Sequence, residues 1–282
     1  MTEQAADLSH LQAKADRLRA LHREGPPLVL ANAWDVASAV VVESTGAPAV
    51  ATTSAGVAWS LGVPDGDLLG RERALQLIAR VARAVSVPVT ADIESGFGDD
   101  AAGVTETVRG VLRGGAVGVN IEDVSPTDEA ALRPVPEQVE RLAAARGAAD
   151  AAGVALFLNA RVDVFLREVG DPESRLAETL ARAAAYLEAG ADGIFVPGVV
   201  DPATLEKLVG AIPAPLNVLV GPGAPPVPEL ARLGVRRISL GSSVAAAAYA
   251  VAERAAREIA TTGSYDSVRE SLGYDRLNLL VR

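Results

Sequence analysis

Eight short apolar segments alternate with helical segments from residue 28 onward, and this alternation restricts the fold more than any other feature. The apolar segments lie at residues 28–32, 47–53, 85–89, 116–122, 154–161, 191–196, 215–220 and 235–240. Short apolar runs of this kind are typical of parallel strands that are buried on both faces. Eight such strands with helices between them, over about 250 residues, predict an α/β fold, the (β/α)8 TIM barrel.

The helices are predicted from apolar residues at helical spacing and from the glycine or proline that follows each run. We expect them at residues 9–24, 34–45, 68–84, 99–114, 136–151, 172–189, 202–211, 226–233, 244–261 and 265–272. His10 and His22 are expected on the surface of the first helix, because no partner motif adjoins either.

A doubly wound open sheet is the competing fold. That fold usually has fewer strands and a glycine-rich turn after the first one, whereas Asn32-Ala-Trp-Asp35 occupies this turn here. No repeat or low-complexity linker divides the chain. We therefore predict a single barrel domain over residues 1–282, with a C-terminal helical extension at about 244–282.

Composition excludes several classes of function. The 282 residues carry a net charge of −10 with scattered Lys and Arg, so the sequence predicts no nucleic-acid partner and no membrane surface. The absence of cysteine removes disulfides, thiolate metal sites and thiol catalysis. No apolar run reaches the length of a membrane span, and the N-terminus has no signal-peptide pattern, so we expect a cytoplasmic protein.

Polar residues gather at the ends of the predicted strands. They are Asn32, Thr53, Asp92, Glu94, Glu122, Asn159, Arg161 and Asn217. In a (β/α)8 barrel the C-terminal ends of the strands converge on one mouth, which holds the active site. Strand ends are also where any chain becomes polar, but a recurrence on so many strands favours a site.

Three acidic residues in this group, together with Asp65, indicate a metal site. Asp92 and Glu94 project to the same side of an extended strand, so either this strand end faces open solvent or a cation lies between the two carboxylates. Glu122 follows the next strand, and Asp65 lies in the loop at residues 60–67. A set of oxygen donors without histidine or cysteine favours Mg²⁺ or Mn²⁺ over zinc.

Arg161 provides a planar donor that can bind a carboxylate or phosphate at two points. The alternative for Arg161 is a salt bridge to Asp163 or another neighbouring acid. Ser54-Ala-Gly56 either presents backbone N–H groups to an anionic oxygen or is a plain loop. A metal and an arginine at one mouth favour breaking or forming a bond at the carbon next to a carbonyl group. The residue pattern leaves retro-aldol cleavage, decarboxylation and phosphoenolpyruvate rearrangement all open.

Four motifs, in the same order, resemble those of the isocitrate lyase/phosphoenolpyruvate mutase superfamily. Asp92-Ile-Glu-Ser-Gly-Phe-Gly98 resembles its D-x-D-x-G-[YF]-G signature, with Glu94 where Asp is usual. Ser60-Leu-Gly-Val-Pro-Asp65, Asn120-Ile-Glu-Asp123 and Asn159-Ala-Arg-Val-Asp163 resemble three further segments of that superfamily. The resemblance extends from about residue 28 to residue 243.

The resemblance implies a barrel that exchanges a C-terminal helix within a homodimer or homotetramer. It implies Mg²⁺ bound directly by Asp92 and through water by Asp65, Glu94 and Glu122. It also implies that Arg161 binds the acid group of a small oxo-acid substrate, and that Thr53-Ser54-Ala55 forms a backbone cradle for a carboxylate or phosphonate oxygen. On this basis we assign catalysis to Arg161, Glu122 and Asp65, and substrate binding to Arg161, Thr53, Ser54, Ala55, Asn32, Asn159 and Asn217.

The sequence departs from the superfamily in the segment after the fourth strand. Isocitrate and methylisocitrate lyases carry a Lys-Lys/Arg-Cys-Gly-His loop there, and phosphonomutases carry Lys-Thr-Asn-Ser, whereas this chain has Ser125-Pro-Thr-Asp-Glu-Ala-Ala-Leu-Arg133. Pro197 lies near the position of a phosphonomutase histidine. We expect residues 125–136 to form a lid that sets the reaction, with Asp128, Glu129 and Arg133 either in contact with substrate or simply exposed.

The sequence therefore predicts a Mg²⁺-dependent lyase or decarboxylase that acts on a small 2-oxo or 2-hydroxy dicarboxylic acid through an enolate. The alternative within the superfamily is cleavage or rearrangement of a P–C bond in a phosphonopyruvate-like compound. An alternative of another class is a barrel that binds an oxo acid without turnover.

Overall fold

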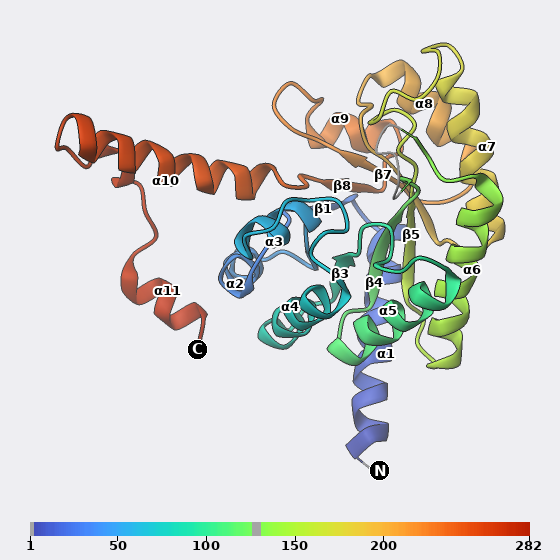
Figure 1. The fold of residues 1–282 in the computed structure, drawn as a ribbon, viewed down its shortest axis with the longest axis horizontal. Coiled ribbons are helices and arrows are strands. Elements are labelled where there is room, and N and C mark those ends of the chain that lie inside the picture. Colours follow the sequence, from blue (N-terminus) through green and yellow to red (C-terminus); the bar gives the residue numbers. More distant parts are fainter. Residues whose placement is uncertain (1–2, 126–130) are drawn as a thin grey trace.

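The computed structural model describes residues 3–125 and 131–282, and it confirms the barrel prediction (Figure 1). The strands are β1 (Leu28–Leu30), β2 (Val50–Ala51), β3 (Val89–Asp92), β4 (Gly118–Glu122), β5 (Phe157–Arg161), β6 (Gly193–Val196), β7 (Leu216–Leu219) and β8 (Arg237–Ser239). They pair in parallel in the order β1-β8-β7-β6-β5-β4-β3-β2. Because the barrel has eight strands, its interior is just wide enough to be filled by side chains.

The barrel closes between β1 and β2 just beyond the strands themselves. Ala33 and Thr52 form an isolated parallel bridge. The Ala33 amide donates to the Ala51 carbonyl at 2.8 Å, and the Thr53 amide donates to the Ala33 carbonyl at 3.0 Å. These bonds bring the end of β1 against the end of β2, so the C-terminal ends of all eight strands surround one mouth.

Helices follow the strands, and most of them cover the outside of the barrel (Figure 1). They are α1 (Glu3–Arg23), α2 (Val36–Ser44), α3 (Ser54–Ser60), α4 (Arg71–Ala84), α5 (Ala101–Gly114), α6 (Val135–Ala151), α7 (Arg175–Glu188), α8 (Pro202–Ala211), α9 (Val227–Arg232), α10 (Ser243–Thr261) and α11 (Tyr274–Leu280). The sequence analysis missed α3, because Gly56 and the serines at either end read as a loop.

The predicted helix at residues 265–272 is wrong. Only one turn of 3₁₀ helix forms, over Asp266–Val268. The Glu258 carboxylate accepts hydrogen bonds from the Ser264 hydroxyl at 2.6 Å, the Asp266 amide at 2.7 Å and the Ser267 amide at 2.8 Å. These bonds hold the chain in a turn around the end of α10, and the following helix starts only at Tyr274.

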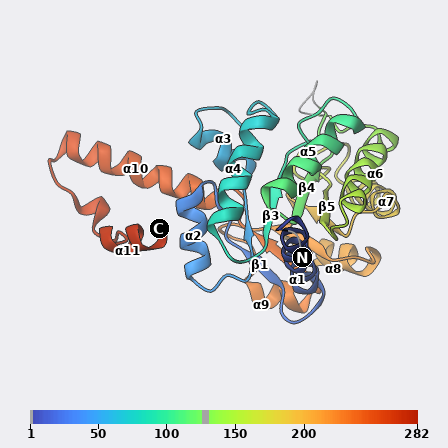
Figure 2. The ribbon, with the colours of Figure 1, turned by 90° about the horizontal axis from the view of Figure 1, so that it is seen from below.

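Helix α1 lies across the end of the barrel opposite the mouth, in front of the strands when the molecule is viewed from below (Figure 2). The Ala155 amide donates to the Gln12 side chain at 3.0 Å, and Arg19 donates to the Leu156 carbonyl at 3.3 Å. Ala155 and Leu156 both lie just before β5. Helix α1 therefore covers the N-terminal ends of the strands.

The prediction of a surface position is wrong for His22, whereas His10 is exposed as predicted. His22 is 1% exposed and stacks on Phe157, with 3.6 Å between the ring centroids. Its Nδ1 lies 2.7 Å from the Leu18 carbonyl, and burial together with Arg237 lowers the pKa of His22 to about 3. His22 is therefore neutral, and it is buried because α1 turns this face toward the barrel interior.

The chain beyond residue 243 forms an arm that leaves the barrel (Figure 1). Along α10 only Ala245 is buried, and α11 returns to contact α2. The arm exposes large apolar side chains, which include Tyr249, Val251, Ile259, Tyr265 and Leu279. Within the described residues, no helix combines the length and the apolarity needed to cross a bilayer.

Candidate active site

The charged residues at the strand ends meet at the mouth of the barrel. Asp92 ends β3, Glu122 ends β4 and Arg161 ends β5, while Glu94 lies two residues beyond β3. The strand register places Glu122 directly beside Arg161. Since parallel strands end at the same edge of the sheet, four of the residues predicted to act at the site share one rim.

Arg161 is held between two carboxylates. Its Nη1 lies 2.6 Å from Glu122 Oε2, and its Nε lies 2.8 Å from Asp163 Oδ1. The Phe195 ring lies beneath the guanidinium, whose carbon is 5.8 Å from the ring centroid. Burial alone would lower the pKa of Arg161, but Asp163 and Glu122 outweigh burial and raise it. Arg161 is therefore a fixed, permanently charged cation at the rim.

Glu94 ties the loop that carries Asp65 to the end of β3. Its Oε2 accepts a hydrogen bond from the Gly66 amide at 3.0 Å and a second one from the Asp67 amide. Glu94, Asp67 and Phe97 all have positive φ, at 50°, 60° and 49°. Non-glycine residues rarely adopt this conformation, and clusters of them occur at functional sites.

Burial raises the pKa values of three acids at the rim, because it disfavours their charged forms. Burial raises the pKa of Asp92, with Arg161 opposing the rise and Asp65 adding to it. Burial also raises the pKa of Glu94 to about 8, with Asp65 and Asp92 among the contributors. Burial raises the pKa of Glu122 well above its ordinary value despite Arg161. A bound cation would reverse these shifts, because it favours the charged form of each carboxylate.

The acids lie near one another without forming a ready-made ligand shell. Within residues 3–125 and 131–282, no three His, Asp or Glu side chains are placed to hold one metal ion directly. Glu94 is bonded to backbone amides, Glu122 is bonded to Arg161, and Asp65 is exposed on its loop. This donor set fits a hard cation that keeps several of its waters, as Mg²⁺ does, better than a fully dehydrated one. The assignment of Asp92, Glu94, Glu122 and Asp65 to a metal stays a prediction.

The junction between β2 and α3 presents backbone groups to the same mouth. Thr53 is the N-cap of α3 and forms no side-chain cap, and Thr53 and Ala55 are buried. The first amides of a helix have no partner within the helix. A backbone hydrogen bond from Ser54 opposes the rise in the pKa of Asp92, so this amide faces the acidic rim.

Two of the three predicted substrate-binding asparagines lie one layer below the rim. Asn159 Nδ2 donates to Asn120 Oδ1 at 2.9 Å and to Asn217 Oδ1 at 3.1 Å. Asn217 Nδ2 donates to Ser239 Oγ at 2.9 Å. These side chains are buried and bonded to one another. The network fixes the floor of the mouth.

Asn32 is bonded to the backbone at the barrel closure. Its Oδ1 accepts from the amides of Leu240 at 3.1 Å and Gly241 at 2.9 Å, and its Nδ2 donates to the Thr52 carbonyl at 2.9 Å. One side chain thus joins the ends of β1, β2 and β8. The structure gives Asn32 a role in shaping the mouth.

The sequence analysis missed Arg237, a buried cation beneath the rim. Its Nη2 donates to Asn120 Oδ1 at 3.2 Å, and burial lowers its pKa to about 10, with Asp92 as the opposing charge. A signal was present in the sequence, because Arg236 and Arg237 are adjacent in a predicted buried strand. Side chains alternate along a strand, so one of the two must point inward.

The predicted lid is described only at its two ends. Asp128 and Glu129 lie outside the described residues. The Ser125 amide donates to the Ala131 carbonyl at 3.0 Å, which joins the two ends. The reading of Arg133 as an exposed loop residue is wrong: its side chain is 4% exposed and pairs with Glu137. Arg133 is buried because its amide binds the Asp123 carbonyl at 2.8 Å and draws this segment against β4.

The fold and the rim together define a (β/α)8 barrel with an acidic, arginine-containing site at the C-terminal ends of its strands, the position of the active site in barrel enzymes. The chain belongs to the phosphoenolpyruvate phosphomutase family, whose model matches residues 18–260. This family and its relatives include lyases, mutases and hydrolases. The superfamily predicted from the four motifs is thereby confirmed.

Relatives with different printed activities match most of the chain. An uncharacterised protein of Mycobacterium tuberculosis is 39% identical over 241 residues, which cover 85% of this chain and 87% of that protein. An oxaloacetate decarboxylase of Ectopseudomonas mendocina is 34% identical, over 76% of this chain and 68% of the relative. The 2-methylisocitrate lyase of Escherichia coli is 31% identical, over 73% and 69%.

Solved structures give the same fold. A Burkholderia cenocepacia protein, assigned provisionally as a phosphonomutase, is 45% identical with a TM-score of 0.83 and covers 86% of this chain and 99% of its own. A phosphonopyruvate hydrolase in complex with oxalate and Mg²⁺ is 27% identical with a TM-score of 0.81, over 95% and 94%. The chain is therefore similar both to enzymes that act on carbon–carbon bonds and to proteins named for phosphonate chemistry.

Proposed function

We propose that the protein is a Mg²⁺-dependent lyase or decarboxylase that breaks a carbon–carbon bond in a small 2-oxo or 2-hydroxy dicarboxylic acid. The observation that carries the proposal is the set of acids around the fixed cation Arg161 at the barrel mouth, in which Glu94 and Glu122 are buried and Asp92 is partly buried. Similarity to an oxaloacetate decarboxylase and to 2-methylisocitrate lyase supports the type of reaction.

Asp92 would hold the Mg²⁺ directly, and Asp65, Glu94 and Glu122 would hold it through its waters. When bound, Mg²⁺ supplies a positive charge beside the carbonyl group next to which the bond breaks. The hydrolase structure that contains oxalate and Mg²⁺ shows that a related barrel binds this combination. Mn²⁺ has the same preference for oxygen donors and is expected to substitute.

Arg161 binds a carboxylate of the substrate at two points in this proposal. Its planar fork suits a carboxylate, and its contacts to Glu122 and Asp163 already set the direction of the guanidinium. The amides of Ser54 and Ala55 at the start of α3, where Ser54 already faces Asp92, would bind a substrate oxygen. Because these groups are fixed before substrate arrives, little ordering is needed on binding.

The predicted asparagines contribute indirectly. Asn159 and Asn217 hold the layer beneath the substrate, and Asn32 holds the wall, because their side-chain amides are bonded within the barrel. No cysteine is available for proton transfer, in contrast to the lyase loop described above. The group that protonates the product therefore differs from the one in isocitrate lyases.

Cleavage or rearrangement of a P–C bond in a phosphonopyruvate-like compound is the second candidate. The 45% identity to a provisionally assigned phosphonomutase favours it. The sequence of residues 125–133 opposes it, because the Lys-Thr-Asn-Ser segment of phosphonomutases is absent.

Turnover separates these functions. The protein is incubated with Mg²⁺ and, in turn, oxaloacetate, an alkylmalate, methylisocitrate and phosphonopyruvate, while formation of pyruvate, phosphate and phosphoenolpyruvate is followed. Pyruvate alone supports the proposal, and phosphate or phosphoenolpyruvate supports the second candidate. Thermal stabilisation by these compounds without any product would overturn both and identify a binding protein.

We also propose that the arm formed by α10 and α11 packs against a second copy of the chain in a homodimer or homotetramer. Its exposed apolar residues support this, because a monomer rarely exposes so many large apolar side chains on one segment. Sedimentation of the intact protein tests the proposal, and an Ile259→Asp variant should shift any assembly toward the monomer. A wild-type protein that sediments as a monomer at micromolar concentration would contradict it.

A further inference from the structure

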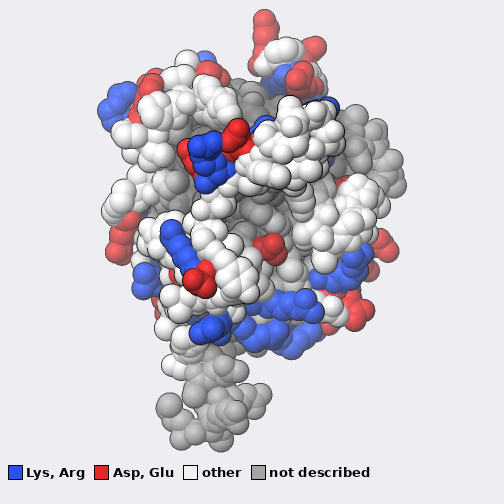
Figure 3. All heavy atoms as spheres, turned by 90° about the vertical axis from the view of Figure 1, so that its left-hand side faces the viewer, with Lys and Arg blue, Asp and Glu red and all other residues white. Residues whose placement is uncertain are grey.

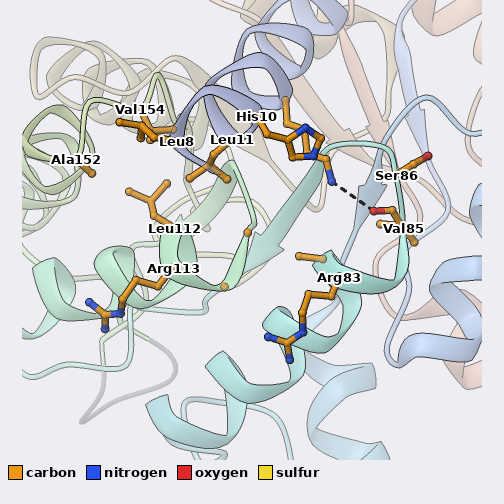
Figure 4. A pocket seen from close by; sticks show the side chains of 14 residues that line it. Leu8, His10, Leu11, Arg83, Val85, Ser86, Leu112, Arg113, Ala152 and Val154 are labelled. Carbon is orange, nitrogen blue, oxygen red and sulfur yellow. Dashed lines mark hydrogen bonds between the residues drawn. The ribbon is translucent and has the colours of Figure 1, made fainter. Parts of the chain in front are cut away.

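A groove lies at the end of the barrel opposite the candidate active site. Its walls are the first half of α1 on one side and the C-terminal ends of α4 and α5 on the other (Figure 4). Val85 lies just before β3, Gly115 just before β4 and Val154 just before β5. The groove therefore lies against the N-terminal ends of the strands, whereas the acidic rim lies at their C-terminal ends. Its volume is about 810 Å³, within the range of small-molecule sites.

The lining of the groove separates into an apolar end and a polar end (Figure 4). Leu8, Leu11, Leu112 and Val154 gather at one end, with Arg113 below Leu112 on the same side, and His10, Arg83 and Ser86 lie toward the other. Lys14 also lines the groove, and its Nζ donates to the Val85 carbonyl at 3.4 Å. A ligand that fills the groove must have an apolar body with a polar group toward one end.

The basic residues that line the groove indicate that the polar group of the ligand is negatively charged. His10, Lys14, Arg83 and Arg113 line the groove, and no acidic residue lines it in the described part of the chain. Lys14, Arg83 and Arg113 form no ion pair with a carboxylate of the described residues. This concentration of cations is unexpected in a chain with a net charge of −10.

The surroundings of the arginines and of Lys14 differ. Arg83 and Arg113 lie in the last turns of α4 and α5, where a cation interacts favourably with the helix dipole. Glu43 faces Lys14, but its Oε1 accepts hydrogen bonds from the Ser86 amide at 2.7 Å and the Ser86 hydroxyl at 2.6 Å. Basic side chains also gather on the lower part of the molecule in Figure 3. Arg73, Arg80 and Arg83 are exposed on α4.

We propose that this groove binds a single-chain amphipathic anion of the fatty-acid class, with the acid group at Lys14 and Arg83 and the alkyl chain over Leu8, Leu11 and Leu112. Such a ligand would use both features of the groove, since its alkyl chain contacts the apolar side chains and its acid group contacts the cations. A short dicarboxylic acid, as proposed for the barrel mouth, would leave the apolar end unfilled. The site is thus separate from the proposed catalytic function and does not depend on it.

Dodecanoate is the probe, titrated calorimetrically into the full-length protein without Mg²⁺. Dodecyltrimethylammonium has the same chain length with the opposite charge, and acetate has the acid group without the chain. We expect dodecanoate to bind with one site per chain and at least about tenfold more tightly than either control compound. Equal binding of the two dodecyl compounds, or no binding of dodecanoate, would overturn the proposal.

Variants locate the site. Lys14→Ala combined with Arg83→Ala should weaken dodecanoate binding about tenfold, and Leu8→Asp should weaken it similarly. Arg80→Ala is the matched control, because Arg80 is exposed on α4 and does not line the groove. Leu8, Arg83 and Arg80 are all exposed, so these variants should fold, which circular dichroism checks. Unchanged binding in the groove variants would refute the site. If Leu8→Asp instead changes the oligomeric state of a protein that binds no dodecanoate, a second copy covers the groove and the proposal is wrong.

Discussion

Replacing Glu94 by glutamine should make the metal-free protein more stable at neutral and alkaline pH. Glu94 is 2% exposed, and burial together with neighbouring acids raises its pKa from the ordinary 4.5 to about 8. Glutamine has nearly the same shape and can still accept the hydrogen bonds from Gly66 and Asp67 through its side-chain oxygen. The substitution therefore removes the charge while the loop contact remains.

The direction and the size of the effect follow from proton linkage. A carboxyl group with a raised pKa in the folded state contributes full stability below its unfolded pKa, and that contribution is lost as pH rises through the folded value. For Glu94 the loss extends from about pH 4.5 to about pH 8. Each pH unit in this window costs about 1.4 kcal/mol, so wild type should lose about 3 to 4 kcal/mol relative to Glu94→Gln between pH 5 and pH 8.

Urea unfolding followed by circular dichroism, in EDTA at pH 5, 6, 7 and 8, measures this difference directly. Asp92 and Glu122 also have raised pKa values, so both proteins should lose stability with rising pH, but wild type should lose more. A difference between the two proteins that stays constant from pH 5 to pH 8 would show that Glu94 is ionised throughout. The conclusion that burial raises the pKa of Glu94 in the metal-free protein would then be wrong.

Three further substitutions test the site and its support. Asp92→Ala should abolish Mg²⁺-dependent turnover of the active substrate yet keep the far-UV spectrum of wild type, because this side chain adds charge rather than packing; an unfolded variant would make Asp92 structural. Arg161→Lys should lower kcat/KM at least about a hundredfold, since an ammonium cannot form the planar two-point contact, and near-normal kinetics would remove Arg161 from substrate binding. Tyr186→Phe removes the hydrogen bond from Tyr186 to buried Asp123 at 2.8 Å and should cost about 1 to 2 kcal/mol in urea unfolding, with unchanged kcat as the sign that this network is structural.

The barrel could be predicted from the sequence because alternation of buried strands and helices is a local signal. The C-terminal arm shows where local signals fail. The turn at Asp266–Val268 depends on the Glu258 carboxylate, which lies eight residues earlier in the chain than Asp266. Helix α3 was missed because seven residues carry little periodicity, and its position is fixed by packing of Gly56 against Trp34 and Ala245.

The rim could be predicted because the strand ends of a barrel converge for any conformation of the loops that follow them. The partners of each side chain could not be predicted, since they come from different strands and loops. Nothing local to Glu94 indicates that amides of residues 66 and 67 bind it, and nothing local to His22 indicates that it stacks on Phe157. Arg237 is an intermediate case, since strand alternation requires an inward arginine but does not identify Asn120 as its partner.

The two readings of Arg161 considered from the sequence, a substrate-binding cation and a salt bridge, are compatible. An arginine that bound only solvent at the rim would lose side-chain entropy when it engaged a substrate. Contacts to Glu122 and Asp163 remove that freedom in advance, and the Phe195 ring restricts it further. Two carboxylates around one guanidinium also leave the rim with excess negative charge, which a divalent cation near Glu122 and Asp92 would offset. In the proposed function, the salt bridge would prepare Arg161 for a substrate carboxylate, and the bound metal would offset that added negative charge.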